Sequence, residues 1–154
     1  MLSVTGLVES AQRLSLEDLK NFADQIQDVS AIVPGRVGRA IHFRELLAKV
    51  GVSSSAKFVT LQAEDGFFAS LPLGELNQAL VVYSLDGSSL LPTDKGGPLR
   101  FLIPNVEHCS TEAREKYGLD KCANVKHLRT MHITEQPGRD NRPTSDDEHE
   151  ALHH

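Results

Sequence analysis

The sequence predicts an α+β domain built from mixed, mainly antiparallel sheets and a few short helices. Residues 56–71 hold two segments of strand-forming residues around a Glu-Asp-Gly turn, which indicates a β-hairpin. Residues 79–84 are strongly apolar, as is typical of a central strand, and a hairpin turn of the Asp-Gly type follows at residues 85–88. Apolar residues recur at helical spacing in 16–25 and 41–50, so each of these segments predicts one short helix.

The composition is that of an ordinary globular domain. At 154 residues the chain has the length of one domain, and 40% of its residues are hydrophobic. A formal net charge of −5 argues against nucleic acid as a partner, because phosphate binding draws on a basic surface. No apolar run approaches a membrane span, and the first residues lack a secretory signal. We therefore predict no membrane partner and a cytoplasmic location, although a mature exported chain would have the same features.

The two predicted helices have start or stop signals. Ser15 can cap the first helix, which is expected over residues 16–25. Gly51 follows the second helix, over residues 41–50, and can end it in a left-handed conformation. Between the helices, the alternation of apolar residues in 29–33 indicates a strand.

The C-terminal third of the chain predicts a domain boundary. Residues 106–121 are polar and favour a helix, and residues 125–133 read as the last strand. From residue 135 the chain is rich in charged residues and proline and has no apolar pattern. We therefore predict one domain over residues 1–134 and a flexible polar tail over residues 135–154.

Residues 94–104 suggest a site for an anion. Gly96 and Gly97 indicate a turn whose backbone N–H groups are uncovered, and alternating apolar residues after them indicate a strand. Bare N–H groups between Lys95 and Arg100 would form a cradle for a phosphate or a similar anion. The alternative interpretation is a glycine turn with solvated charges on an edge strand.

The same residues carry a family resemblance. Gly-Gly-Pro-Leu-Arg-Phe-Leu-Ile-Pro at 96–104 and Asn-Val-Lys at 124–126 resemble segments of the molybdopterin-binding domain of the sulfite oxidase family. Residues 65–73 and 80–90 are similar to two further phrases of that family, in the same order. The resemblance extends from about residue 16 to residue 133 and implies the sulfite-oxidase-type α+β fold.

The resemblance also implies a cofactor and the residues that hold it. The cofactor is molybdopterin, and Arg100 matches an arginine that contacts its phosphate end in the family. Lys95 stands where the family has a histidine, and Asp65, or Glu64 beside it, stands where the family often has a pterin-contacting aspartate. The expected cofactor-binding residues are Asp65, Lys95, Gly96, Gly97, Arg100, Asn124, Val125 and Lys126.

One departure from the family concerns the metal. The resemblance implies a molybdenum-ligating cysteine between the two helices, but residues 28–42 contain none. That interval offers Arg36 and Arg39, which either face the pocket or belong to a solvated loop. No catalytic residue is predicted. The expected function is a molybdopterin-binding domain of an oxidoreductase-like protein, which as an enzyme would be molybdenum-dependent. The alternative is a non-catalytic module for a small anion, or for a protein partner at residues 106–121.

The two cysteines leave several possibilities open. His108, Cys109, Cys122 and His127 carry nitrogen and sulfur ligands suited to zinc, but their spacing matches no standard zinc pattern. Cys109 and Cys122 could instead form a disulfide or remain two free thiols. We predict no metal site from these residues.

Overall fold

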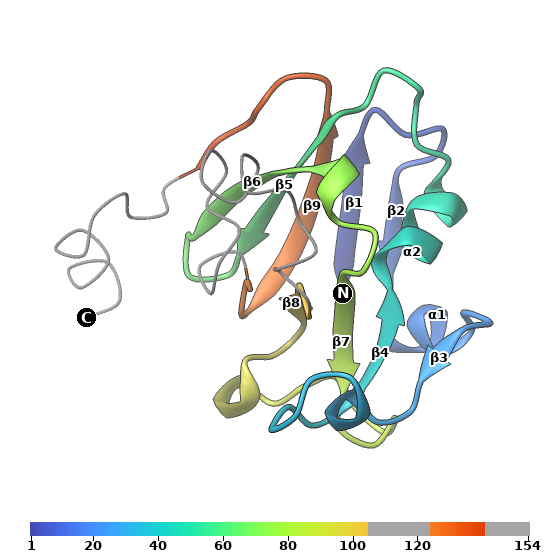
Figure 1. Ribbon diagram of the computed structural model, residues 1–154, viewed down its shortest axis with the longest axis vertical. Helices are drawn as coiled ribbons and strands as arrows, with labels where there is room; N and C mark the ends of the chain where they lie inside the picture. Colours follow the sequence, from blue (N-terminus) through green and yellow to red (C-terminus); the bar gives the residue numbers. More distant parts are fainter. Residues whose placement is uncertain (105–123, 141–154) are drawn as a thin grey trace, which may run out of the picture.

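Two β-sheets enclose the main hydrophobic core (Figure 1). The computed structural model describes residues 1–104 and 124–140. In this part of the chain, no helix is both long enough and apolar enough to span a membrane. The cytoplasmic location stays a prediction. The observed architecture is the α+β class that the sequence predicts, with mainly antiparallel sheets and short helices.

The larger sheet has five strands among the described residues, and the last of these strands in the sequence lies at its centre. It pairs in parallel with the first strand, Ser3 opposite Thr130, and antiparallel with the hairpin strand next to it, Thr60 opposite His132. The strands in spatial order are β2 (Gln12–Leu14), β1 (Leu2–Gly6), β9 (Leu128–Thr134), β5 (Phe58–Ala63) and β6 (Phe68–Pro72).

The smaller sheet has four antiparallel strands and separates two apolar clusters. Val81 and Tyr83 face the main core, whereas Leu80 and Val82 belong to a second, smaller cluster. The alternation of strand side chains explains this division. The strands in spatial order are β3 (Gln25–Ile26), β4 (Arg39–His42), β7 (Leu80–Ser84) and β8 (Arg100–Leu102).

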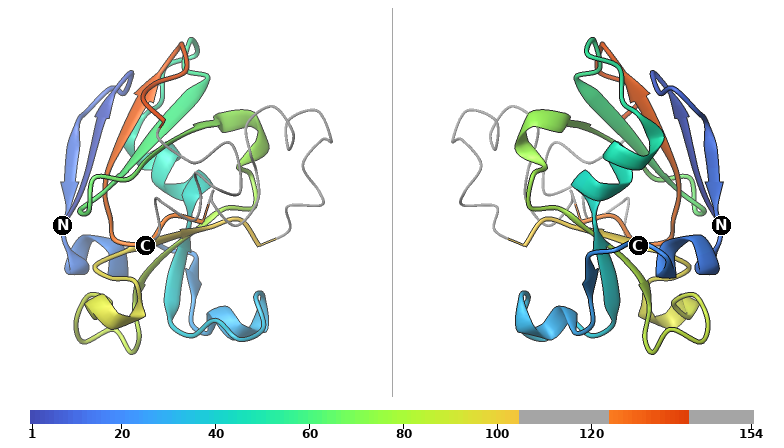
Figure 2. Two further views of the ribbon diagram at one scale, coloured as in Figure 1. Left: turned by 90° about the vertical axis from the view of Figure 1, so that its left-hand side faces the viewer. Right: turned by 90° about the vertical axis from the view of Figure 1, so that its right-hand side faces the viewer.

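Short helices connect successive strands of the two sheets. Phe43 of α2 (Phe43–Val50) meets Phe101 of β8 edge to face, with ring centroids 5.2 Å apart and an interplanar angle of 86°. This packing joins the helix to the smaller sheet through the main core. The other helices in the described ranges are α1 (Leu16–Lys20) and the 3-10 helices η1 (Val29–Ala31), η2 (Leu73–Glu75) and η3 (Thr93–Lys95). The helices η1 and η3 lie at the same end of the smaller sheet (Figure 2).

Several predicted elements agree with the structure. The hairpin expected at residues 56–71 is β5 and β6, and the apolar segment at 79–84 is β7, an interior strand whose residues are all buried. Gly51 ends α2 in the left-handed region at φ 71°. The last strand, expected at 125–133, is β9.

The first predicted helix is too long. Helix α1 ends at Lys20 rather than near residue 25, and Gln25 instead pairs with Ile41 in the smaller sheet. The side-chain Nε2 of Gln25 donates to the carbonyl oxygens of Leu19 and Phe22 at 2.9 and 3.0 Å. These bonds satisfy carbonyl groups at the C-terminal end of the helix. Ser15 caps the helix as expected, in a full capping box with Asp18.

The interval between the helices also differs from the prediction. Residues 29–33 do not form a strand, because Asp28 accepts a hydrogen bond from Ser30 N at 3.0 Å and starts η1. The second helix begins at Phe43, since residues 39–42 pair with β7 as β4. Tertiary pairing therefore overrides the helical spacing of residues 41 and 42.

Two more differences concern strands. The Asp-Gly turn at residues 85–88 forms, with Ser88 N donating to Asp86 Oδ1 at 2.9 Å, but it does not close a tight hairpin. The next strand in the sequence that pairs with β7 is β8, which begins only at Arg100. Strands β1 and β2 form in the structure but are not predicted from the sequence.

Part of the predicted tail contacts the larger sheet. Gly138 N donates to Ser70 Oγ, and Ser70 N donates to Asp140 Oδ2, both at 2.9 Å. The Arg139 guanidinium lies 4.4 Å from the ring centroid of Phe68. The predicted helix at 106–121, which contains Cys109, lies outside the described residues, as do Cys122 and residues 141–154. The boundary near residue 134 stays a prediction.

Candidate functional site

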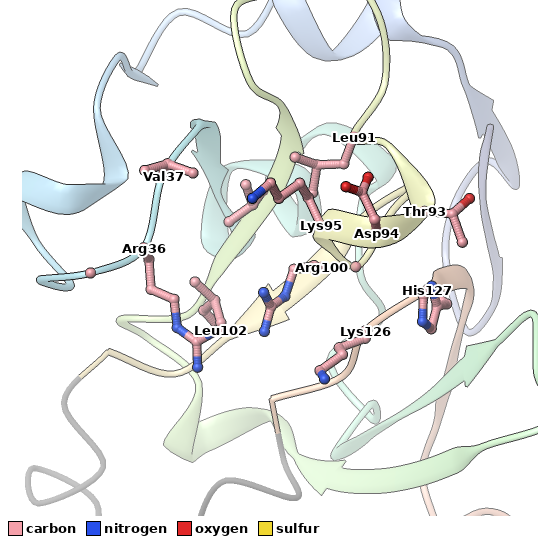
Figure 3. Close-up of a pocket in the computed structure, with 13 residues that line it drawn as sticks. Arg36, Val37, Leu91, Thr93, Asp94, Lys95, Arg100, Leu102, Lys126 and His127 are labelled. Atoms are coloured by element: carbon pink, nitrogen blue, oxygen red, sulfur yellow. The ribbon is translucent and has the colours of Figure 1, made fainter.

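A cavity of about 320 Å³ lies on the face of the smaller sheet that points away from the main core (Figure 3). Its floor contains Val82, Leu91 and Leu102, which belong to the smaller apolar cluster. Three separate segments form its walls: residues 35–37, 93–96 and 126–127. The cavity therefore combines an apolar floor with walls that carry most of the charge.

Strand alternation places Arg100 in this cavity. Its neighbour Phe101 faces the main core, so Arg100 and Leu102 face the opposite side, with Arg100 paired in register with Val82. Gly96, at φ 89°, makes room for the arginine, because a Cβ atom there would lie 2.6 Å from Arg100 Cδ. The glycine thus lets the arginine stem pass close to the turn.

The predicted cradle of bare backbone N–H groups is wrong. Gly96 N donates to the carbonyl oxygen of Thr93 at 3.0 Å, and Gly97 N donates to that of Pro92 at 2.9 Å. The turn of η3 therefore satisfies both groups within the chain. Gly97 is needed for another reason, since a Cβ atom there would collide with the carbonyl group of Leu91. The donors that face the cavity are side chains.

His127 fastens the glycine turn to the start of β9. Its backbone N–H donates to the carbonyl oxygen of Gly96 at 2.8 Å, and its Nδ1 lies 2.7 Å from that of Gly97. A carbonyl oxygen can only accept, so Nδ1 carries the proton and Nε2 is left as the other ring nitrogen. His127 holds this geometry with a positive φ of 56°, which is uncommon for a residue with a side chain. The residue therefore both shapes and lines the cavity.

The cavity is basic. It is lined by one carboxylate, Asp94, and four cations. The four cations are Arg36, Lys95, Arg100 and Lys126. None of them forms an ion pair with another described residue. Burial, and secondly the positive charge of Arg36, lower the pKa of Arg100.

Arg100 Nε is a buried donor without a hydrogen-bond partner among the described residues. Leaving such a donor unsatisfied is unfavourable, and an anion in the cavity would remove the penalty. The cationic lining therefore fits the phosphate end of a cofactor. It does not offer a set of metal ligands, since the described residues contain no cluster of three or more histidine, cysteine, aspartate or glutamate side chains.

The structure brings half of the predicted site residues to the cavity. Those that line it are Lys95, Gly96, Arg100 and Lys126. Gly97 is buried and does not line the cavity, but its carbonyl oxygen is hydrogen-bonded to Nδ1 of the lining residue His127. The other three residues do not line the cavity.

These three residues have identifiable roles in the fold. Asn124 Oδ1 accepts from Ile103 N at 2.9 Å, and the carbonyl oxygen of buried Val125 accepts from Phe101 N at 2.8 Å. Both contacts hold the segment before β9 against β8. Asp65 is exposed in the hairpin turn, where its Oδ1 accepts from Phe67 N at 3.2 Å.

Several lining residues were not among the predicted site residues, and two of them, Arg36 and His127, bear on the chemistry of the site. The sequence leaves open whether Arg36 and Arg39 face the pocket or belong to a solvated loop. In the structure Arg36 lies in the wall of the cavity, whereas Arg39 is not part of the lining. For His127 the sequence alone suggests only the role of a metal ligand. The signal for His127 was its position directly after Lys126, which the resemblance assigns to the cofactor.

The fold and the cavity together define an α+β domain with a basic site for an anionic ligand. Residues 39–141 match the protein family described as oxidoreductase molybdopterin binding domain. The match covers most of the chain, which therefore belongs to this family of molybdopterin-binding domains. Molybdopterin is the cofactor that this family binds.

One relative and one solved structure are similar to this chain. The uncharacterized oxidoreductase YuiH of Bacillus subtilis (strain 168) is 31% identical over 113 residues, which cover 68% of this chain and 57% of YuiH. The sulfane dehydrogenase SoxCD of Paracoccus pantotrophus has the same fold, with a TM-score of 0.63 at 16% identity. That match covers 93% of this chain and 40% of the SoxCD chain. This chain thus spans little more than half of the one relative and less than half of the other.

Proposed function

We propose that this chain binds molybdopterin in the basic cavity, with the phosphate end of the cofactor on Lys95, Arg100 and Lys126. The observation that carries the proposal is the buried Nε of Arg100, which has no hydrogen-bond partner in the described part of the chain. A phosphate oxygen would satisfy this donor and also offset the repulsion among the cations.

His127, which lines the cavity, would border the pterin end of the cofactor. The carbonyl oxygen of His127 accepts from Glu64 N at 2.9 Å, so the hairpin turn with Asp65 lies beside this end of the site. Asn124 and Val125 would act indirectly, because their bonds to Ile103 and Phe101 position Lys126. Lys126 is exposed at the rim and reaches into the cavity from the segment that they hold.

The chain would contribute binding and orientation, and a bound molybdenum cofactor would supply oxo-transfer redox chemistry. A thiolate is the soft ligand expected at such a metal, and residues 28–42 contain no cysteine. We therefore propose a cofactor-binding domain that does not perform oxo transfer by itself. Cys109 and Cys122 lie outside the described residues.

The test is the cofactor content of the chain purified from a host that makes molybdopterin. Molybdenum is measured by inductively coupled plasma mass spectrometry, and pterin by the fluorescence of its oxidised product. We expect pterin near one per chain in the wild type, a large loss in Arg100→Gln, and no change in the control Arg129→Gln on the exposed side of β9. Pterin without stoichiometric metal would support a binding domain. Stoichiometric molybdenum together with oxo-transfer activity would refute the proposal that the domain does not perform oxo transfer by itself, and absence of pterin would refute the whole proposal.

The alternative function is a non-catalytic module that keeps the fold and binds another small anion. The basic lining and apolar floor favour it as a second candidate, since they would suit any phosphorylated molecule of the right size. It would be supported if the folded chain carries no pterin but binds inorganic phosphate. A protein partner at residues 106–121 stays a prediction.

A further inference from the structure

Arg36 enters the cavity from a loop that is closed on itself by backbone hydrogen bonds. Arg36 N donates to the carbonyl oxygen of Val33 at 3.0 Å, and Val33 N donates to that of Val29 at 2.8 Å. Val29 N in turn donates to the carbonyl oxygen of Gly38 at 2.9 Å. These bonds hold the loop after η1 against the start of β4, so the position of Arg36 is set by the fold.

The loop separates two arginines that are close in the sequence. The half-buried side chain of Arg36 lines the cavity. Arg39 instead lies against the turn after β7, where its Nη1 is 3.0 Å from the position of a Cβ atom at Gly87. Its charge contributes to the lowered pKa of Asp86, after hydrogen bonds from Ser88. Arg39 is therefore a matched control for Arg36.

Arg36 and Arg100 are near enough for the charge of one to lower the pKa of the other. In Figure 3 the charged ends of Arg36 and Lys126 lie on one side of the Arg100 side chain, whereas the charged end of Lys95 lies on the other side. No described carboxylate is paired with Arg36, Arg100 or Lys126. Like charges that share a partly buried space repel each other, and an anion between them would reverse the sign of the interaction.

We propose that Arg36, Arg100 and Lys126 form a subsite for a doubly charged tetrahedral oxyanion, the terminal phosphate of a phosphate monoester. Arg36 is the added ligand-binding residue, and Lys95 contributes less than Arg36. This inference rests on the proposed function for the identity of the ligand, but the subsite also binds inorganic phosphate. Two guanidinium groups can each offer a fork of N–H donors to such an anion, which an ammonium group cannot.

The test is isothermal titration calorimetry of the full chain with inorganic phosphate, at an ionic strength held constant with chloride. We expect Arg36→Gln to weaken phosphate binding at least tenfold, Lys95→Gln less than threefold, and Arg39→Gln less than twofold. Nitrate, which has one charge, should bind the wild type at least tenfold more weakly than phosphate. Arg36→Lys keeps the charge but loses the fork, and should weaken phosphate binding between three- and tenfold.

The inference is overturned if the wild type does not bind phosphate, or if Arg36→Gln and Arg36→Lys, both folded by circular dichroism, bind it within twofold of the wild type. A larger loss in Lys95→Gln than in Arg36→Gln would also overturn it. The pterin content of the same wild-type preparation tests the proposed function separately. If the wild type contains pterin but the Arg36 variants bind phosphate as the wild type does, the proposed function stands and the subsite is refuted. If the Arg36 variants bind phosphate more weakly but the wild type contains no pterin, the subsite stands and the proposed function is refuted.

Discussion

Replacing Arg100 by methionine should make the ligand-free domain more stable while removing phosphate binding. Arg100 Nε is buried without a partner among the described residues, and the neighbouring charge of Arg36 opposes that of Arg100. Methionine has a stem of similar length and no polar donor. Its side chain would rest on Val82 and Leu102, which form part of the apolar floor. A residue kept for ligand binding is often one that lowers stability when the ligand is absent.

The magnitude follows from the unsatisfied donor. A buried polar group without a hydrogen bond costs about 1–3 kcal/mol, and Arg100→Met removes this cost. The loss of repulsion from Arg36 acts in the same direction. We expect the free energy of unfolding to rise by about 1–3 kcal/mol, and the melting temperature by about 2–4 °C for each kcal/mol in a chain of this size.

The assay is urea denaturation of protein that is free of pterin and phosphate, with Arg129→Met as the control. Arg129 is an exposed residue of β9, so its replacement should change stability by less than about 0.5 kcal/mol. If Arg100→Met were less stable than the wild type by more than about 1 kcal/mol, Arg100 would be satisfied in the ligand-free domain. The reasoning from the unpaired donor would then fail.

Three further predictions concern the fold. Gly97→Ala should lower the free energy of unfolding by at least about 1–3 kcal/mol in urea denaturation, because its Cβ would collide with the backbone of Leu91. Phe101→Ala should lower it by about 3–5 kcal/mol in the same assay, since Phe101 is fully buried against Phe43. Hydrogen bonds from Ser15 lower the pKa of Asp18, so its contribution to stability is present above about pH 4 and lost below it. The stability difference between the wild type and Asp18→Asn should therefore shrink from pH 6 to pH 2, and a constant difference would contradict this explanation.

Elements with local determinants could be predicted from the sequence. The hairpin of β5 and β6 follows from alternation around a turn, and β7 follows from a continuous apolar run. Strand β1 could not be placed in its sheet in this way, because one of its two partners, β9, lies more than a hundred residues later. The missed start of α2 has the same cause. Ala40 and Ile41 pair with β7, and this long-range contact decides against the local helical pattern.

The site, too, could be predicted from the sequence only in part. Lys95, Arg100 and Lys126 could be predicted because the resemblance and the charge pattern agree on them. The role of the glycine N–H groups could not, since the sequence indicates the turn but not that the carbonyl oxygens of Thr93 and Pro92 accept from these donors. Arg36 could not be separated from Arg39 by residue type, because the direction of each side chain depends on how the loop closes on Val29.

The position of β9 has a consequence for how the domain is made during translation. The ribosome adds this strand after all the other described strands, yet it is the one that joins β1 to β5 in the larger sheet. Until it emerges, the pair of β1 and β2 and the hairpin of β5 and β6 expose edges that have no partner. The nascent chain therefore has unpaired strand edges until β9 is available, and unpaired edges make β-proteins prone to aggregate. Completion of the larger sheet is thus tied to the synthesis of residues 128–134.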